Sequence, residues 1–351
     1  MKIAVFLPNW LGDVVMATPT LRAIRRHFGG ARIVGIMRPY LAAVLAGSDW
    51  LSEQWHFNPQ GKDKDLGRWA LVTRMRRERF DLAVLLPNSF GSALWACLGG
   101  ARRRLGYVRD GRGLLLTDRV DPPRVAGRRV ESPMVDYYLK LAEAAGAGPE
   151  SRRLELRLTP AEEEAAEQVY RRLGLRAGRV IAINSGSSNG EARSWPPENF
   201  GRLARQIVDR LDHQVLVMCG PKERPIAQEI VGRAGGRGVH SMAEQPLDLG
   251  TAKACLARSR LMVSTDSGPR HVAAALGKPV ITLRGPTLPV WSENPTVEAI
   301  DLRLELDCIG CRQQVCPLGH HRCMRDLPVE MVYEAVERLL RRSLALCGIR
   351  S

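Results

Sequence analysis

Apolar residues fall into short runs along the chain, and these runs alternate with stretches in which apolar residues recur every three or four positions. The run "KIAVFL" (2–7) precedes a predicted helix over 14–28, and a predicted helix over about 66–79 leads into "FDLAVLLP" (80–87). Continuous apolar runs such as "LAVLL" are typical of strands that are buried on both faces. This alternation predicts a mostly parallel sheet covered by helices.

The same alternation restarts in the second half of the chain. The segment "TPAEEEAAEQVYRRLG" has Thr159 as a predicted helix cap, Pro160 at the first helical position and glutamates in the first turn. Further strand-like runs then alternate with helical patterns. We therefore predict the α/β class, with two Rossmann-like domains over 1–158 and 159–327 and a last helix within 328–351.

The loops that follow strands are the places to look for chemistry, because open α/β sheets bind ligands at the carboxyl ends of their strands. In the second domain, "NSGSSNGEARSW" (184–195) follows a strand. Its backbone amides, with the hydroxyls of Ser185 and Ser187, are suited to wrap an anion, and Arg193 adds a fixed positive charge. A flexible polar turn has the same composition.

A second such loop is "STDSGPRHVAAALGKP" (264–279). Ser267 and Gly268 open a helix whose first turn has free N–H groups, and Gly268 lets a phosphate approach the backbone closely. His271 lies on that first turn. The alternative is an ordinary helix cap, made by Asp266 or Ser267, with His271 packed as a helix residue.

Glu223 in "MCGPKER" (218–224) is a candidate acceptor of hydrogen bonds from ribose hydroxyls, although an exposed glutamate at a helix start has the same spacing. The chain has no GxxxxGK[ST] loop, no GxGxxG after the first strand and no GxSxG elbow. These absences argue against a P-loop NTPase, a dinucleotide dehydrogenase and an α/β-hydrolase.

The first domain has a carboxylate where a phosphate loop is usual. In "FLPNWLGDVVMATPTLRAIRRHFG" (6–29), Asp13 stands beside Gly12 at the mouth of a predicted helix. We expect the helix N-terminus to keep the pKa of Asp13 low, as suits a base, although a simple cap gives the same pattern. Asn88 and Ser89 stand at the end of a later strand and are candidates for binding a ligand.

Composition adds an anionic partner to this picture. The 351 residues have a formal net charge of +15, and segment 101–130 holds nine arginines against three aspartates. Nucleic acid, an acidic membrane surface and a phosphorylated substrate all fit such a charge, and so does a genome that favours arginine codons. The apolar start ends at Pro8 and no run is long enough to span a bilayer, so we expect a cytoplasmic protein.

Four of the eight cysteines are clustered, with the spacing C-x2-C-x4-C-x6-C. They are Cys308, Cys311, Cys316 and Cys323. Four thiolates at short spacings are a candidate structural zinc site, and reduced or redox-labile thiols are the alternative.

Three segments together resemble glycosyltransferase family 9, the ADP-heptose:lipopolysaccharide heptosyltransferase family. They are "LGDVVMATPTLRAIRRHFG", "NGEARSWPPENFGRLARQI" and "STDSGPRHVAAALGKPVITLRGPT". "VLLPNSFGSAL" and "CIGCRQQVCPLGHHRCM" are most similar to the heptosyltransferase II branch. The resemblance implies a GT-B architecture, with parallel sheets facing a central cleft. The first domain is expected to bind the acceptor and the second domain to bind the nucleotide sugar. The final helix is expected to cross back and pack against the first domain.

The resemblance also implies roles for single residues. Asp13 matches the catalytic base of the family, and Arg193 falls where the family usually has a lysine that contacts the donor diphosphate. Glu223 matches the acid that binds ribose. The nucleotide-sugar motif is matched by Asp266, Ser267, Gly268 and His271. The sequence departs from the family in "NSGSS", where Pro-Gly is usual, and in Arg193 itself.

The activity implied is an inverting, metal-independent transfer of L-glycero-D-manno-heptose from ADP-heptose to the first heptose of the lipopolysaccharide inner core. Asn88 and Ser89 are expected to bind hydroxyls of that acceptor. The arginines Arg102, Arg103 and Arg104 are expected to hold its anionic groups and to bring the enzyme to the inner face of the inner membrane as a peripheral protein. No cofactor is expected beyond the candidate zinc.

Two alternatives remain open. One is another family 9 enzyme, of heptosyltransferase I or III type or specific for another sugar. The other is a basic nucleic-acid-binding protein, which predicts aromatic stacking residues among the arginines. Segment 101–130 has only Tyr107, so we expect no nucleic-acid partner.

Overall fold

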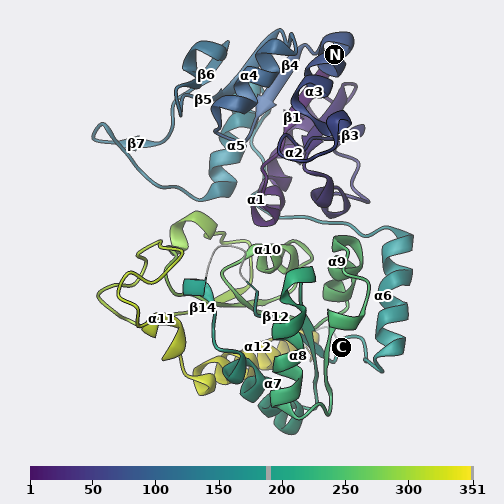
Figure 1. Ribbon diagram of the computed structural model, residues 1–351, viewed down its shortest axis with the longest axis vertical. Helices are drawn as coiled ribbons and strands as arrows, with labels where there is room; N and C mark the ends of the chain where they lie inside the picture. The colour runs from purple at the N-terminus through teal and green to yellow at the C-terminus, as the bar shows by residue number, and fades with distance from the viewer. Residues whose placement is uncertain (187–190, 349–351) are drawn as a thin grey trace. The chain divides into compact units, whose positions relative to one another are not determined.

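The computed structural model describes residues 1–186 and 191–348, with no description of side chains at 191 and 343–348 (Figure 1). The chain divides into two compact units. Unit 1 consists of Met1–Arg157 and Pro289–Thr296, and unit 2 of Leu158–Leu288 and Val297–Ser351. The short segment Pro289–Thr296 therefore belongs with the first unit, although the sequence assigns it to the second.

Unit 1 is built on a six-stranded parallel sheet with the strand order β3-β2-β1-β4-β5-β6. The strands are β1 (Lys2–Phe6), β2 (Arg32–Met37), β3 (Glu53–His56), β4 (Leu82–Leu85), β5 (Arg103–Tyr107) and β6 (Asp118–Val120). This is the doubly wound order, in which the topology reverses between β1 and β4. Because every strand is parallel, the loops after β1, β2, β3 and β4 leave the sheet at one edge.

Helices cover this sheet, and a small antiparallel hairpin forms a separate two-stranded sheet. The α-helices are α1 (Leu11–Met16), α2 (Thr18–His27), α3 (Arg68–Glu78), α4 (Phe90–Leu98) and α5 (Met134–Ala145). The 3₁₀ turns are η1 (Pro39–Val44), η2 (Lys64–Leu66), η3 (Arg112–Leu115) and η7 (Pro289–Ser292). The hairpin strands are β7 (Arg124–Val125) and β8 (Arg128–Arg129).

The single helix predicted over 14–28 is wrong, because α1 and α2 are separated at Ala17. Pro19 has no N–H to donate back to Val15, and its ring is incompatible with an uninterrupted helix. Thr18 instead donates its hydroxyl to the Val15 carbonyl at 2.7 Å. The first helix also begins earlier, at Leu11, so Asp13 lies inside its first turn.

Unit 2 repeats the same sheet topology in the order β11-β10-β9-β12-β13-β14. Its strands are β9 (Val180–Asn184), β10 (Gln214–Met218), β11 (Val239–Ser241), β12 (Leu261–Thr265), β13 (Val280–Leu283) and β14 (Ala299–Leu302). Its α-helices are α6 (Pro160–Arg172), α7 (Pro197–Leu211), α8 (Arg224–Ala234), α9 (Leu249–Ala257), α10 (Gly268–Ala275), α11 (Arg322–Arg325) and α12 (Val329–Gly348). Its 3₁₀ turns are η4 (Glu191–Arg193), η5 (Pro221–Glu223) and η6 (Met242–Glu244).

The predicted cap of α6 is confirmed. Thr159 accepts a hydrogen bond from the Glu162 amide at 3.3 Å, and the Glu162 carboxylate accepts one from the Thr159 amide at 2.8 Å. This capping box satisfies two backbone donors that the helix itself leaves unpaired.

The last helix, α12, packs into unit 2. Its apolar stripe includes Val332, Val336 and Leu339, which are fully buried in a core shared with α7 and the sheet. These contacts place the described part of the helix in the unit 2 core. The expectation that the final helix reaches back to the first domain stays a prediction. No helix in the described part of the chain is both long and apolar enough to cross a membrane.

Candidate active site

Asp13 lies in the first turn of α1, directly after the loop that follows β1. Its Oδ1 accepts a hydrogen bond from the hydroxyl of Tyr138 at 3.1 Å, and Tyr138 is buried on α5. Burial raises the pKa of Asp13, and the Tyr138 hydrogen bond opposes that rise. The expected low pKa is therefore wrong, because desolvation outweighs the dipole of a helix of only six residues.

Tyr138 is held in its protonated form. Burial, together with the neighbouring Asp13 carboxylate, raises the pKa of the Tyr138 hydroxyl well above its ordinary value. The hydroxyl therefore remains a donor to Asp13 across the neutral range. No local sequence pattern indicates this contact, because the two residues lie 125 positions apart.

A second network fixes Asn88, which follows β4. Its Oδ1 accepts hydrogen bonds from the Tyr137 hydroxyl at 3.2 Å and from Arg112 Nη2 at 3.3 Å. Both lone pairs of the Asn88 amide oxygen therefore accept hydrogen bonds, so a further partner of this side chain has to bind the amide nitrogen. Ser89 caps α4, with its hydroxyl accepting from the Ser92 amide at 3.3 Å.

Arg112 is fully buried, and sequence reasoning assigned it no role beyond its share of the net charge. Its guanidinium donates to the Tyr107 carbonyl at 2.9 Å, to the Ser92 hydroxyl at 3.1 Å and to the Pro87 carbonyl. Burial lowers the pKa of Arg112 to about 10, so it remains charged at neutral pH. It joins the loop after β4 to the segment after β5.

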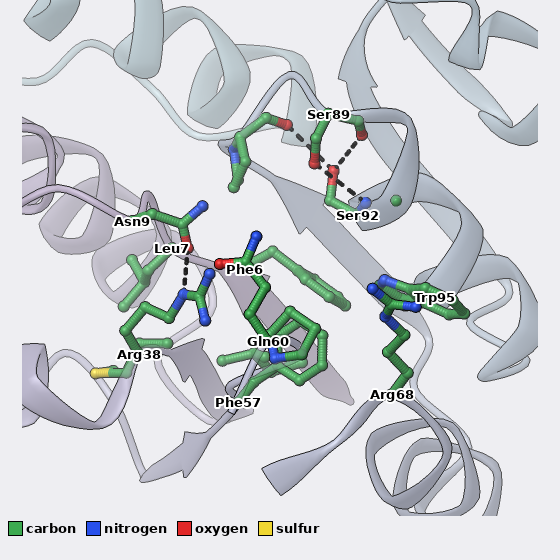
Figure 2. Close-up of a pocket in the computed structure, with 15 residues that line it drawn as sticks. Phe6, Leu7, Asn9, Arg38, Phe57, Gln60, Arg68, Ser89, Ser92 and Trp95 are labelled. Atoms are coloured by element: carbon green, nitrogen blue, oxygen red, sulfur yellow. Dashed lines mark hydrogen bonds between the residues drawn. The ribbon is translucent and has the colours of Figure 1, made fainter. Parts of the chain in front are cut away.

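A cavity of about 270 Å³ opens at the same edge of the sheet (Figure 2). It is lined by residues that follow β1, β2, β3 and β4, including Asn9, Arg38, Phe57 and Ser89. Figure 2 shows Arg38 beside Asn9 on one side of the cavity and Arg68 against Trp95 on the other. Of the predicted acceptor residues, Ser89 lines this cavity.

Arg102, Arg103 and Arg104 lie at the amino end of β5, the opposite edge of the sheet from this cavity. Arg102 pairs with Asp81 at 3.6 Å, and Arg103 pairs with Asp118 at 2.6 Å. Arg104 donates to two backbone carbonyls. The structure therefore separates these three arginines from Asn88, Ser89 and Asp13, because they begin a parallel strand instead of following one.

In unit 2, Asp266 follows β12 and is the centre of a buried ion cluster. Its Oδ1 accepts from Arg270 at 2.8 Å and its Oδ2 from Arg284 at 3.0 Å. Burial favours the neutral carboxyl, but the two arginines prevail and lower the pKa of Asp266 to about 2. Asp266 thus shapes this loop with both of its oxygens engaged.

Ser267 is the N-cap residue of α10, and its hydroxyl accepts from Asn184 Nδ2 at 3.0 Å. This bond links the loop after β12 to the end of β9. Gly268 is the first residue of the helix. His271 is buried, and desolvation followed by the nearby Arg270 lowers its pKa well below the ordinary value, so the imidazole is neutral.

The loop after β9 has buried polar atoms without partners in the described part of the chain. They are Ser185 Oγ and Arg193 Nε. Such atoms are rare in folded proteins and indicate a site for a ligand or water.

Glu223 lies beside the same loop. Its carboxylate is so close to Gly186 that a Cβ on residue 186 would overlap it. Glu223 Oε2 accepts a hydrogen bond from the Gly220 amide at 2.7 Å. Ser187 lies outside the described residues.

The clustered cysteines do come together. Cys308, Cys311, Cys316 and Cys323 line one cavity of about 20 Å³ with His320 and His321. Backbone N–H groups at 318–321, first among them that of His321, lower the pKa of Cys316, while burial raises that of Cys323 to about 11. Within residues 1–186 and 191–348, however, no three Cys, His, Asp or Glu side chains are placed so that they hold one metal ion.

Comparison with known proteins gives one family and full-length relatives. The model of glycosyltransferase family 9 (heptosyltransferase) matches residues 68–321, more than half of the chain. Lipopolysaccharide heptosyltransferase 2 of Escherichia coli (strain K12) is 28% identical over 353 residues, covering 97% of this chain and 99% of that protein. Lipooligosaccharide heptosyltransferase 2 of Campylobacter jejuni (serotype O:2) is 26% identical, covering 98% of this chain and 99% of that one.

A solved structure is similar over the same length. The ADP-heptose lipopolysaccharide heptosyltransferase II of Escherichia coli superposes with a TM-score of 0.80 at 26% identity. The match covers 98% of this chain and 99% of that chain. Both units therefore have counterparts in that protein.

Proposed function

Because the chain belongs to glycosyltransferase family 9, we propose that it transfers L-glycero-D-manno-heptose from ADP-heptose to the first heptose of the lipopolysaccharide inner core. The observation that carries this proposal is the full-length similarity to heptosyltransferases 2. A buried carboxylate, Asp13, in one unit and the unpartnered buried polar atoms of Ser185 and Arg193 in the described part of the other unit support it. The GT-B fold that the sequence implied, with two parallel-sheet α/β domains, is confirmed.

In the proposed reaction, the acceptor hydroxyl attacks the anomeric carbon of the donor. The bond from that carbon to the diphosphate oxygen breaks as the new glycosidic bond forms, and ADP leaves. Attack opposite the leaving group inverts the centre, so a β-linked heptose becomes α-linked.

Asp13 is the proposed general base, which takes the proton of the attacking hydroxyl. A carboxylate accepts that proton more readily when its own pKa is raised toward the working pH. Burial raises the pKa of Asp13 in this way, and the Tyr138 hydroxyl fixes the orientation of the carboxylate. Asn88, whose amide oxygen is already occupied, is proposed to donate to an acceptor hydroxyl.

Unit 2 is the proposed donor domain. Negative charge grows on the diphosphate as ADP leaves, so donors fixed in advance stabilise the transition state. The candidates are Ser185, Arg193 and the N-terminal amides of α10 at Gly268. Glu223 is proposed to accept from the ribose hydroxyls. Asp266 and His271 are proposed to hold the loop after β12 in its conformation. Both oxygens of Asp266 pair with arginines, and His271 is buried.

These protein groups supply positive charge to the diphosphate, and we propose that transfer proceeds without a metal ion. We also propose that the protein works in the cytoplasm, bound peripherally to the inner face of the inner membrane where its glycolipid acceptor lies.

The test is a transfer assay with purified protein, ADP-heptose and a heptose-bearing inner-core acceptor. Mass spectrometry should show one added heptose, NMR of the product should show the α linkage, and excess EDTA should leave the rate unchanged. A β-linked product would exclude the inverting mechanism, and loss of activity in EDTA that a divalent ion restores would exclude metal independence.

A further inference from the structure

We infer that a cavity at the amino edge of the unit 2 sheet binds a small molecule that carries one or two phosphate groups, and that Arg258, Arg260 and Lys278 hold it. The inference goes beyond the proposed function, because the proposed donor loops follow the strands and this cavity precedes them. Its ligand is therefore an effector of the protein and not a substrate of the transfer.

The cavity lies where four neighbouring strands begin. Its volume is about 440 Å³, and its lining residues directly precede β9, β12, β13 and β14. These strands are adjacent and parallel, and such a volume is within the range of small-molecule sites. Because β9 and β12 have five residues each, the sheet separates this cavity from the loops after them by roughly 15 Å.

Three cationic side chains line the cavity, together with one acidic side chain. Arg258 and Arg260 lie between α9 and β12, and Lys278 lies between α10 and β13. The acid is Glu298, an exposed residue directly before β14. Within residues 1–186 and 191–348, none of the three cations forms an ion pair. Their charges are therefore left for a group that the described chain does not supply.

Arg258 also has a buried donor without an acceptor. Its Nε is buried and has no hydrogen-bond partner among the described residues. The guanidinium stands 5.5 Å from the centre of the Tyr170 ring, which attracts a cation. The ring is fixed, since the Tyr170 hydroxyl donates to the Cys255 carbonyl at 2.9 Å. A buried N–H group without an acceptor costs free energy, and a phosphate oxygen removes that cost.

Arg260 and Lys278 repel each other across the cavity. Burial, followed by the charge of Arg260, lowers the pKa of the Lys278 ammonium. Two like charges held at one cavity are unfavourable, and an anion between them turns the repulsion into attraction. Phosphate suits both side chains, because a guanidinium fork matches two of its oxygens and a lysine ammonium binds it as a compact charge.

The ends of the neighbouring helices do not account for these charges. Arg258 is the C-cap residue of α9, and Lys278 follows the end of α10, so both lie near carbonyl groups that attract cations. Each helix C-terminus is equivalent to only about half a negative charge. Two such ends and Glu298 do not neutralise three cations, so the cavity keeps a positive charge.

Arginines before β9, at the same edge of the sheet, provide the contrast. Arg179 and Arg176 each pair with the carboxylate of Asp212 at 3.3 Å. The protein supplies an acid to these two arginines and none, in its described part, to the three cations of the cavity. That difference is expected where the anion comes from solution.

A soluble ligand fits this cavity better than a lipid headgroup. Surfaces that bind membranes usually insert large apolar side chains beside their cations. Of the exposed large apolar side chains in the part of the chain that the structure describes, none lines the cavity.

The experiment measures the binding of pyrophosphate and of inorganic phosphate by calorimetry, with ADP present to fill the donor site. The wild type should bind one ion per chain. Loss of a charged hydrogen bond should raise Kd about 10- to 100-fold in Arg260→Gln and Lys278→Gln. Arg179→Gln should bind as the wild type does. Tighter binding of pyrophosphate would assign two phosphate groups to the ligand, and equal binding would assign one.

Chemical labelling gives a second readout that is confined to the site. Acetic anhydride acetylates exposed lysines, and peptide mass spectrometry reports the extent at Lys278 and at Lys140, an exposed lysine on α5. Pyrophosphate should slow the labelling of Lys278 and leave that of Lys140 unchanged. Neither readout needs transfer, so the site stands even if ADP-heptose gives no product.

Three results would overturn the inference. One is the absence of any phosphate binding beyond the donor site. Another is an equal affinity in the wild type, Arg260→Gln and Lys278→Gln, or a protection of Lys278 that potassium chloride reproduces at the same ionic strength. The third is binding of phosphatidic acid vesicles through Arg260 where neither phosphate ion binds, which would assign a lipid headgroup instead.

Discussion

Tyr138 donates its hydroxyl to Asp13 Oδ1 at 3.1 Å, and this bond opposes the rise in pKa that burial imposes on the carboxyl. The two residues come from the first and last α-helices of the N-terminal part of unit 1, α1 and α5. The bond therefore orients the proposed base and lowers the pH at which it becomes ionised, against the larger effect of burial.

Replacing Tyr138 with phenylalanine should shift the pH dependence of transfer. Asp13 acts as a base only when ionised, and the lost hydrogen bond no longer lowers its pKa, so the acid limb of kcat/KM should move to higher pH. The measurement is a pH profile of kcat/KM for both proteins. Tyr170→Phe, which removes another buried hydroxyl in unit 2, should leave the limb in place. An unmoved limb in Tyr138→Phe would show that Asp13 does not set it.

Asp13→Asn should lose turnover by about 10²- to 10⁴-fold, the usual contribution of a general base. Binding of ADP, measured by calorimetry, should be unchanged, because the proposed donor groups lie in unit 2. Near-normal turnover would remove Asp13 from the role of base.

The same variant should be more stable than the wild type at neutral pH. A carboxyl whose pKa is raised by folding stabilises the protein below its unfolded pKa, and that stability is lost as the pH rises through the folded pKa. The ionised Asp13 therefore costs stability at neutral pH, and Asn does not. Thermal denaturation should show a higher Tm for Asp13→Asn at neutral pH and a smaller difference at about pH 4. A gain that does not shrink in acid would contradict the raised pKa.

Asp266→Asn should destabilise unit 2 by about 3 kcal/mol or more, because it leaves Arg270 buried without its carboxylate partner, while Arg284 keeps its ion pair with Asp301. Urea denaturation measures this loss. Asp212→Asn is the control, since Asp212 is 71% exposed and pairs with arginines at the surface, where a pair contributes at most about 1 kcal/mol. Equal losses of stability in the two variants would show that the buried ion cluster stabilises the protein no more than a surface ion pair does.

Arg193→Gln should weaken ADP binding about 10- to 100-fold, as expected for the loss of a charged hydrogen bond. Its Nε is buried without a partner in the described residues, which is the arrangement of a group awaiting an anion. Arg193→Lys keeps the charge and should recover part of the affinity. Calorimetric titration with ADP checks both variants, and unchanged affinity in Arg193→Gln would remove this residue from the donor site.

Much of the fold follows from local patterns. Buried strands were predictable as continuous apolar runs, and the cap at Thr159 as a capping box with Pro160 behind it. Asp13 was predictable as a candidate because a carboxylate stood where a phosphate loop was expected. The break at Ala17 was missed, although Pro19 is a local signal for it.

Contacts between distant segments were beyond such patterns. The tyrosines of α5 read as ordinary apolar positions of an amphipathic helix, and nothing in the sequence connects them to Asp13 or Asn88. Arg112 is one of nine arginines in the basic segment 101–130. Of these nine, the structure buries only Arg112 fully, and it does so in η3. Net charge does not reveal which end of a strand a residue occupies, so the position of Arg102, Arg103 and Arg104 at the start of β5 was not predictable from it. Their role in binding the acceptor stays a prediction.

The most direct test of the central proposal offers ADP-heptose to the wild-type protein with two lipopolysaccharide inner-core acceptors, one that carries a first heptose and one that lacks it. We predict transfer to the heptose-bearing acceptor, release of ADP in equal amount, and loss of both in Asp13→Asn. Transfer only to the heptose-free acceptor would contradict the proposed acceptor, and no transfer to either would contradict the proposed reaction.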